Sequence, residues 1–289
     1  MKKNTSTPFI QLTQDEKNNK LKEIELYLED QNNILLVNLE FIMTNKCNGN
    51  CSYCFEADQK QKRGAGQPKE ITWDIMETYL NLVRKNREIR KLPDNEPSRI
   101  IFFGGEPMLK KDLIIKCLKE CKETFWCFTI ISNGTIGWDE DFIQLCQKKW
   151  VDIQISVDGN LKSNSHRLYH NGEPMFFDTY KTLMMLKNYQ GIMVSSVVSE
   201  DNIENLYENF CFLEKIGIPK IQFFLDRINV KITDDIQDRI INQFILIGKH
   251  ICEKIKKKEK YSIPLGTHSF LKFLEYEGWR YEKPKRLFE

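Results

Sequence analysis

Three cysteines stand within eight residues of this 289-residue sequence, in the stretch CNGNCSYC: Cys47, Cys51 and Cys54. Thiolates are soft ligands for zinc, copper(I) or iron–sulfur clusters, so thiols at this spacing predict a metal site. A structural zinc ion takes four protein ligands, and the nearest other cysteine or histidine along the chain is Cys117. A [4Fe-4S] cluster on three thiolates leaves one iron open for chemistry. Surface thiols and a disulfide framework are the alternatives, but the chain shows no secretory signal.

Apolar stretches precede each group of candidate residues. Residues 34–43, ILLVNLEFIM, predict a buried strand that ends at the cysteines. Residues 100–103, IIFF, predict a second strand, which runs into GGEP at residues 104–107. Paired glycines let the backbone pass close to a ligand, and the carboxylate behind them suits an ammonium group. A third strand, residues 127–131, ends in Ser132-Asn133-Gly134, which by itself is typical of a turn.

The cysteine loop, with an aromatic residue before its last cysteine, resembles the radical S-adenosylmethionine (SAM) superfamily, and the GGEP and Ser-Asn-Gly segments follow in that family's order. The resemblance implies that the three thiolates hold one [4Fe-4S] cluster, that SAM chelates its open iron, and that GGEP binds the amino group of SAM. The residues implied to contact SAM are Tyr53, Phe55, Gly104, Gly105, Glu106, Pro107, Ser132, Asn133, Ser156, Arg167 and Val198.

The stretch ISVDGNLKSNSHRLYHNG is similar to a signature of the branch that contains peptide maturases and anaerobic sulfatase maturases. In that comparison Ser156 and Arg167 approach the SAM carboxylate, since the planar fork of arginine grips a carboxylate in two places. The sequence departs from the signature at Val157 and Asn160, and the acid expected after His166 is replaced by Arg167.

Six predicted strands alternate with helices over residues 34–230, which predicts an α/β fold, a (β/α)6 partial TIM barrel. The carboxyl ends of parallel strands meet at one rim, where the candidate residues then gather. A lead-in at residues 1–33 precedes the barrel, and a helical C-terminal extension at residues 231–289 follows it. In the branch that this sequence resembles, a cysteine-rich domain with further clusters usually follows the barrel. Here only Cys252 follows Cys211, so we expect the extension to be no more than the start of such a domain, whose cysteines are missing. Three explanations for the missing cysteines are open: the chain is truncated, it is a natural short form, or the further clusters are supplied from elsewhere.

The composition argues against two classes of protein, those that bind nucleic acid and those that span a membrane. Lysine and arginine number 43 against 41 acidic residues, so no basic footprint for nucleic acid exists. No run of about 18 apolar residues predicts a membrane span. Nine cysteines without a signal peptide predict a cytoplasmic protein. Outside the loop, we expect the other cysteines to be small buried hydrophobes and the four histidines to be structural.

We therefore expect an enzyme that reductively cleaves SAM to a 5′-deoxyadenosyl radical and removes hydrogen from a peptide or protein substrate. An electron donor such as flavodoxin or ferredoxin is the expected partner. Asp226, at the end of the sixth strand, is a candidate proton acceptor by position alone. The alternatives are an anaerobic sulfatase-maturase-like enzyme, a radical SAM enzyme acting on a small molecule in cofactor biosynthesis, and a non-catalytic iron–sulfur or zinc protein.

Overall fold

A computed structural model describes residues 38–54, 70–226 and 228–265. Within them seven strands form one parallel sheet in the order of the chain, β1-β2-β3-β4-β5-β6-β7. The strands are β1 (Asn38–Thr44), β2 (Ser98–Gly104), β3 (Trp126–Ser132), β4 (Asp152–Ser156), β5 (Ile192–Val198), β6 (Lys220–Leu225) and β7 (Ile263–Leu265). The α-helices are α3 (Trp73–Arg90), α4 (Lys111–Glu120), α5 (Glu140–Lys148), α6 (Phe176–Leu186), α7 (Leu206–Lys215) and α8 (Asp234–Lys256), with 3-10 turns η1 (Pro107–Lys110) and η2 (Ile203–Asn205). The predicted α/β class with a parallel sheet is confirmed.

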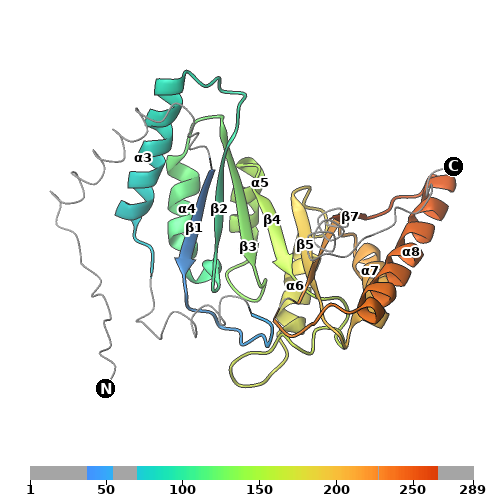
Figure 1. Ribbon diagram of the computed structural model, residues 1–289. Helices are drawn as coiled ribbons and strands as arrows, with labels where there is room; N and C mark the ends of the chain where they lie inside the picture. The colour runs from blue at the N-terminus through green and yellow to red at the C-terminus, as the bar shows by residue number, and fades with distance from the viewer. Residues whose placement is uncertain (1–37, 55–69, 227, 266–289) are drawn as a thin grey trace.

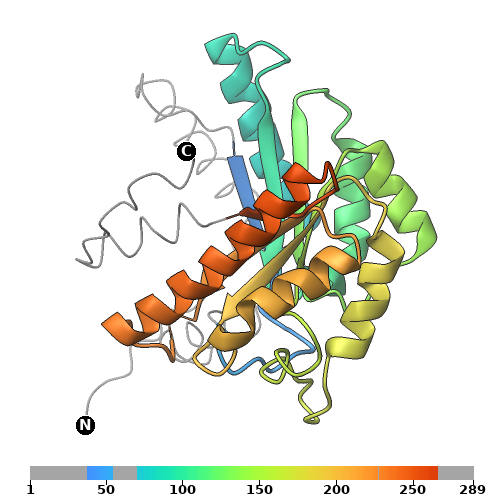
Figure 2. The ribbon, with the colours of Figure 1, turned by 90° about the vertical axis from the view of Figure 1, so that its right-hand side faces the viewer.

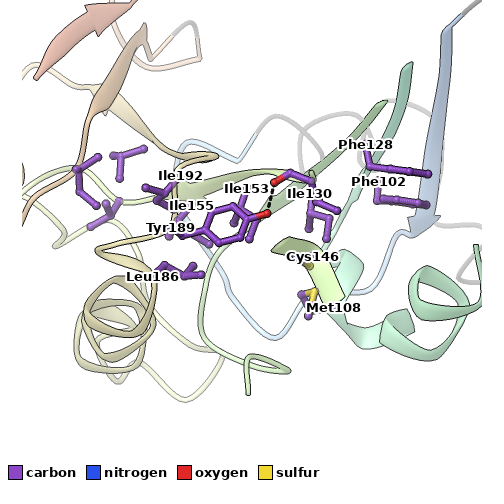
Figure 3. Packing of buried hydrophobic residues seen from close by; sticks show 14 of the residues in the cluster. Phe102, Met108, Phe128, Ile130, Cys146, Ile153, Ile155, Leu186, Tyr189 and Ile192 are labelled. Atoms are coloured by element: carbon purple, nitrogen blue, oxygen red, sulfur yellow. Dashed lines mark hydrogen bonds between the residues drawn. The ribbon is translucent and has the colours of Figure 1, made fainter. Parts of the chain in front are cut away.

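The helices lie along the convex side of the curved sheet (Figures 1 and 2). In β1 buried residues alternate with exposed ones, because successive side chains of a strand point to opposite faces. The core fills the space between sheet and helices (Figure 3): Phe102 of β2 stacks on Phe128 of β3, with ring centroids 6.4 Å apart. Cys146 of α5 and Leu186 of α6 pack into the same cluster.

Several helix starts fall where the sequence predicts them. Thr72 caps α3 by accepting a hydrogen bond from the Ile75 amide, and Asp139 caps α5 through the Phe142 amide. A capping box at Asp201 and Glu204 is also expected from the spacing D-x-x-E. That prediction is wrong: the turn η2 has Asn202 at its N-cap, and the Asp201 carboxylate binds other side chains.

The sheet has one strand more than the six predicted. Ile263–Leu265 pairs in parallel with β6, where Pro264 stands opposite Ile221. Three residues that include a proline carry almost no strand signal, and proline is tolerated at the edge of a sheet, where its missing N–H leaves no partner unbonded. The described part of the extension thus continues the sheet, while the boundaries at residues 33 and 230 stay predictions.

The six cysteines outside the loop divide into three groups by burial, of which Cys127 and Cys211 form the half-buried one. Cys117, Cys121 and Cys146 are buried as expected, and the sulfur atoms of Cys117 and Cys121 lie 3.9 Å apart. Cys252 is exposed on α8, which corrects the expectation that all six are buried.

Some predictions lie outside the described residues. They are the first four residues of the first predicted strand, Phe55, a lead-in helix at residues 14–29 and a last helix at residues 268–279. Among the helices of the described segments, none has both the length and the apolar composition needed to cross a membrane.

Candidate active site at the carboxyl edge of the sheet

The cysteine loop leaves β1 and runs along the lower edge of the sheet in Figure 1, where the carboxyl ends of the parallel strands meet. Cys47, Cys51 and Cys54 are half-buried free thiols. Burial raises the pKa of Cys47 and raises that of Cys51 to about 11, and the neighbouring thiols add to both shifts. These two thiols therefore stay protonated at neutral pH unless a positive centre such as a metal stabilises the thiolates.

Hydrogen-bond donors surround the first thiol. The Gly49 amide lies 3.3 Å and the Asn133 side-chain nitrogen 3.8 Å from the Cys47 sulfur. The same Asn133 nitrogen donates to Asn48 at 2.8 Å, and His170 Nε2 lies 3.0 Å from the Cys47 carbonyl oxygen. N–H donors aimed at a sulfur stabilise a thiolate and tune a cluster bound to it.

No group of three or more His, Cys, Asp or Glu side chains converges on the position of a single metal ion within the described segments. A cubane cluster does not need such convergence, because each thiolate binds a different iron.

The paired glycines of GGEP make room for the cysteine loop itself. A Cβ at Gly105 would stand 2.1 Å from the Lys46 carbonyl oxygen, and one at Gly104, where φ is +129°, would stand 2.5 Å from the Thr44 oxygen. The Gly105 amide donates to Thr44 at 2.7 Å and the Glu106 amide to Lys46 at 2.9 Å. Only residues without a side chain permit this contact between the end of β2 and the loop.

Glu106, two residues past the end of β2, has a fully buried carboxylate. Its Oε1 accepts hydrogen bonds from the Met108 amide (3.0 Å) and the Ser132 hydroxyl (2.8 Å), and its Oε2 accepts one from the Asn133 amide (2.8 Å). Burial raises its pKa to about 7, although these hydrogen bonds act in the opposite direction. Within the described residues Glu106 forms no ion pair, so its charge is left for a cation from outside. Pro107 follows it as the first residue of η1.

The Ser-Asn-Gly segment closes on the same carboxylate. Gly134 has φ of +76°, and its amide donates to the Ser132 hydroxyl at 2.9 Å. The Thr179 hydroxyl of α6 donates to the Asn133 carbonyl at 2.9 Å. The cysteine loop, GGEP and Ser-Asn-Gly are thus brought together, as the sequence predicts.

A second buried carboxylate lies two residues past the end of β4. Asp158 accepts two hydrogen bonds from Arg167, Nε to Oδ2 at 3.1 Å and Nη2 to Oδ1 at 3.2 Å. The Tyr53 hydroxyl donates to Asp158 Oδ2, and the Val197 amide donates to Oδ1 at 2.9 Å. Burial and the Asp158 charge raise the pKa of Tyr53. Burial lowers the pKa of Arg167, but the charges of Asp158, Tyr53 and Cys51, together with the hydrogen bonds to Asp158, outweigh it and raise this pKa. The sequence predicts Asp158 only as part of a turn, and its role as the partner of Arg167 was missed. The signal that could have found this role is its position between the end of a strand and an arginine.

The remaining candidates lie at the ends of β4, β5 and β6. Ser156 is half-buried and pairs in register with Ser195. Val198 is 1% exposed and packs in the core, and its carbonyl accepts a hydrogen bond from the Asp226 amide at 2.9 Å. Asp226 is buried, and its carboxylate accepts hydrogen bonds from the Ile228 and Asn229 amides and the Asn229 side chain. This carboxylate therefore caps a turn of the chain.

A series of side-chain hydrogen bonds on the surface joins the cysteine loop to the segment after β5. The Ser52 hydroxyl lies 2.7 Å from His166 Nδ1, and His166 Nε2 lies 2.8 Å from the Asp201 carboxylate. The Ser199 hydroxyl donates to Asp201 at 2.6 Å. His166 thus has a structural role, as expected, and it plays this role at the candidate site by linking the cysteine loop to Asp201.

The family model of the radical SAM superfamily matches residues 41–210, more than half of the chain. The chain belongs to the radical SAM superfamily, and the predictions of that family and of an enzyme are confirmed.

Two relatives and one solved structure are similar to this chain over most of its length. The radical SAM cyclopropyl synthase TigE of Paramaledivibacter caminithermalis is 28% identical over 72% of this chain and 45% of its own length. An S-adenosylmethionine-dependent nucleotide dehydratase of a Fibrobacter species is 25% identical over 82% of this chain and 69% of its own length. The structure of anSMEcpe with bound AdoMet and the Cp18Cys peptide aligns with a TM-score of 0.62 and 18% identity, over 78% of this chain and 62% of that one. The chain thus spans less than two thirds of TigE and of anSMEcpe.

Proposed function

We propose that Cys47, Cys51 and Cys54 hold one [4Fe-4S] cluster. Three thiols on one loop, with N–H donors at the Cys47 sulfur, supply the soft donor set that such a cluster takes. A cationic iron cluster also offsets the burial that raises the pKa of the free Cys47 and Cys51 thiols.

Glu106 is proposed to bind the amino group of SAM. Its carboxylate is buried, has no cation among the described residues, and keeps an acceptor position on Oε2. Ser132 and Asn133 hold it in place, and the Ser156 hydroxyl is the proposed partner of the SAM carboxylate. The other proposed SAM contacts are Tyr53, Gly104, Gly105, Pro107 and Val198, together with Phe55, which lies outside the described residues.

The cluster, when bound, supplies the electron that splits SAM into methionine and a 5′-deoxyadenosyl radical, which takes a hydrogen atom from the substrate. The chain's own residues orient SAM and hold the cysteine loop against the strand ends. An electron donor of the flavodoxin or ferredoxin type is part of the proposal.

The proposed substrate is a peptide or protein. Two observations support this class: the sequence after β4 is similar to that of peptide and sulfatase maturases, and anSMEcpe, a protein of the same fold, has been solved with a peptide bound.

The observation that carries the proposal is a buried carboxylate without a cation, held at the edge of the sheet where the three thiols lie. The test is anaerobic reconstitution with iron and sulfide, followed by dithionite and SAM. We expect about one 5′-deoxyadenosine per methionine released, and no cleavage after Cys51→Ala. Cleavage that survives this substitution would overturn the proposal.

A small-molecule substrate is the second candidate, because the nucleotide dehydratase matches 82% of this chain. Incubation with nucleoside triphosphates and, separately, with peptides encoded beside the gene separates the two classes. Deuterium from a labelled substrate appears in 5′-deoxyadenosine only with the true substrate.

A further inference from the structure

A short segment after β4 lies along the cysteine loop. The Asn50 amide donates to the Leu168 carbonyl at 2.7 Å, and the Ser52 amide donates to the His166 carbonyl at 3.2 Å. Gly49 and Tyr169 form an antiparallel bridge. Figures 1 and 2 show the same neighbourhood, with the blue loop beside the yellow-green chain that follows β4. The loop is thus paired with residues 166–169, and Arg167 lies in the middle of the pairing.

The Arg167 side chain joins the same two segments through its contacts with Tyr53 and Asp158. Its guanidinium lies 5.3 Å from the centre of the Tyr53 ring and is bonded through two nitrogens to Asp158. The Tyr53 hydroxyl donates to the same Asp158 oxygen as Arg167 Nε. Two buried side chains, Tyr53 of the loop and Arg167 of the paired segment, therefore meet at the Asp158 carboxylate after β4.

Asp158 is itself fixed to the sheet. The Val197 amide of β5 donates to its Oδ1 at 2.9 Å, and its own amide donates to the Asn164 side chain at 3.0 Å. The carboxylate is a point of the framework, and Tyr53 and Arg167 set the distance of the loop from it. Tyr53 stands between two of the cysteines, so this distance also places their sulfur atoms.

We propose that Arg167 is a positioning residue that holds the cysteine loop in its cluster-binding conformation through Asp158 and Tyr53, and not a ligand of the SAM carboxylate. Two of its nitrogens are already bonded to Asp158, and its side chain is 9% exposed. The inference rests on the proposed function in one respect, which is that the loop holds the cluster.

The test separates cluster retention from SAM binding. Arg167→Lys keeps the charge but loses the planar fork, and Tyr53→Phe removes only the hydroxyl. Each variant is reconstituted anaerobically without SAM, and the loss of cluster absorbance to an iron chelator is timed. We expect about tenfold faster loss for Arg167→Lys, since removal of a group that orients metal ligands typically weakens metal binding about 10–100-fold. Tyr53→Phe loses the cluster severalfold faster, and the double variant is no worse than Arg167→Lys alone, because both act through Asp158.

The matched control is Arg84→Lys. Arg84 also forms a forked pair, with Glu123 at 2.5 and 3.3 Å, but it lies on α3, outside the site. We expect wild-type cluster retention and a wild-type electron paramagnetic resonance spectrum of the reduced cluster, whereas Arg167→Lys broadens that spectrum because its loop is no longer held in one conformation.

SAM affinity per cluster-bearing chain decides between the two roles. Positioning predicts that Arg167→Lys loses clusters quickly while the chains that keep one bind SAM within about threefold of wild type. Wild-type cluster retention with a much higher Kd for SAM would overturn the inference and make Arg167 a SAM ligand. If Arg167→Lys does not fold, wild-type retention in Tyr53→Phe overturns it instead. A wild-type chain that never assembles a cluster refutes the proposed function itself, a result distinct from both.

Discussion

Two buried carboxylates at the same edge of the sheet differ in one respect. Glu106 stands two residues past the end of β2, Asp158 two residues past the end of β4, and neither is exposed by more than 1%. Asp158 is paired with Arg167 inside the chain, whereas Glu106 has only uncharged hydrogen-bond donors among the described residues. Burying a charge without a counterion is costly, so an uncompensated carboxylate indicates a ligand that brings the missing cation. One carboxylate holds the framework together, and the other is proposed to bind SAM.

The largest effect is expected on the free energy of unfolding when Asp158 is substituted. Asp158→Asn leaves the Arg167 charge buried and unpaired, so we expect the free energy of unfolding to fall by about 3–5 kcal/mol. Urea unfolding of the cluster-free protein measures this. Asp152→Asn at the other end of β4 is the control: its ion pair with Arg99 is half-exposed, so it changes stability by about 0.5 kcal/mol or less. Equal effects of the two substitutions would contradict the assignment.

The second effect is on ligand binding at Glu106. Glu106→Gln removes the charge proposed to hold the SAM ammonium, which costs about 2–3 kcal/mol or on the order of 100-fold in Kd. Anaerobic calorimetry on the cluster-loaded protein measures it, with Glu123→Gln as a distant control. The unfolding free energy should change far less than in Asp158→Asn. A variant that binds SAM normally but unfolds easily would reverse the two roles.

A third effect is the pH dependence that Glu106 imposes. Its folded pKa of about 7 lies above the ordinary 4.5, so the folded chain holds this proton to higher pH than the unfolded chain does. Its contribution to stability is therefore lost as pH rises from about 4.5 to 7. Binding of the ammonium needs the carboxylate, so SAM affinity rises about tenfold from pH 6 to pH 8. In Glu106→Gln both dependences should disappear, and an unchanged pH profile of SAM affinity would remove Glu106 from this role.

The smallest effect is expected at Asp226. Its carboxylate caps the turn to Asn229, so Asp226→Asn should lower the free energy of unfolding by about 1 kcal/mol. The ratio of modified substrate to 5′-deoxyadenosine should stay the same. A fall in that ratio while SAM is still cleaved would instead support Asp226 as a proton acceptor.

Local signals in the sequence predicted much of the fold and part of the site. Apolar runs located six of the seven strands, and the capping residue Thr72 marked the start of α3. The seventh strand was missed because three residues with a proline have no periodicity to detect. The capping box at Asp201 failed because that carboxylate has a stronger local alternative in Ser199 and His166.

The sequence by itself determined the chemistry at the edge of the sheet: three thiols at fixed spacing after one strand, and a carboxylate behind paired glycines after the next. Spacing and strand order suffice for that, because parallel strands bring their carboxyl ends to one edge. Only the tertiary structure decided which buried carboxylate keeps a cation of its own. Tyr53 and Asp158 are 105 residues apart along the chain, and the hydrogen bond between them depends on how three loops pack, which no local pattern records.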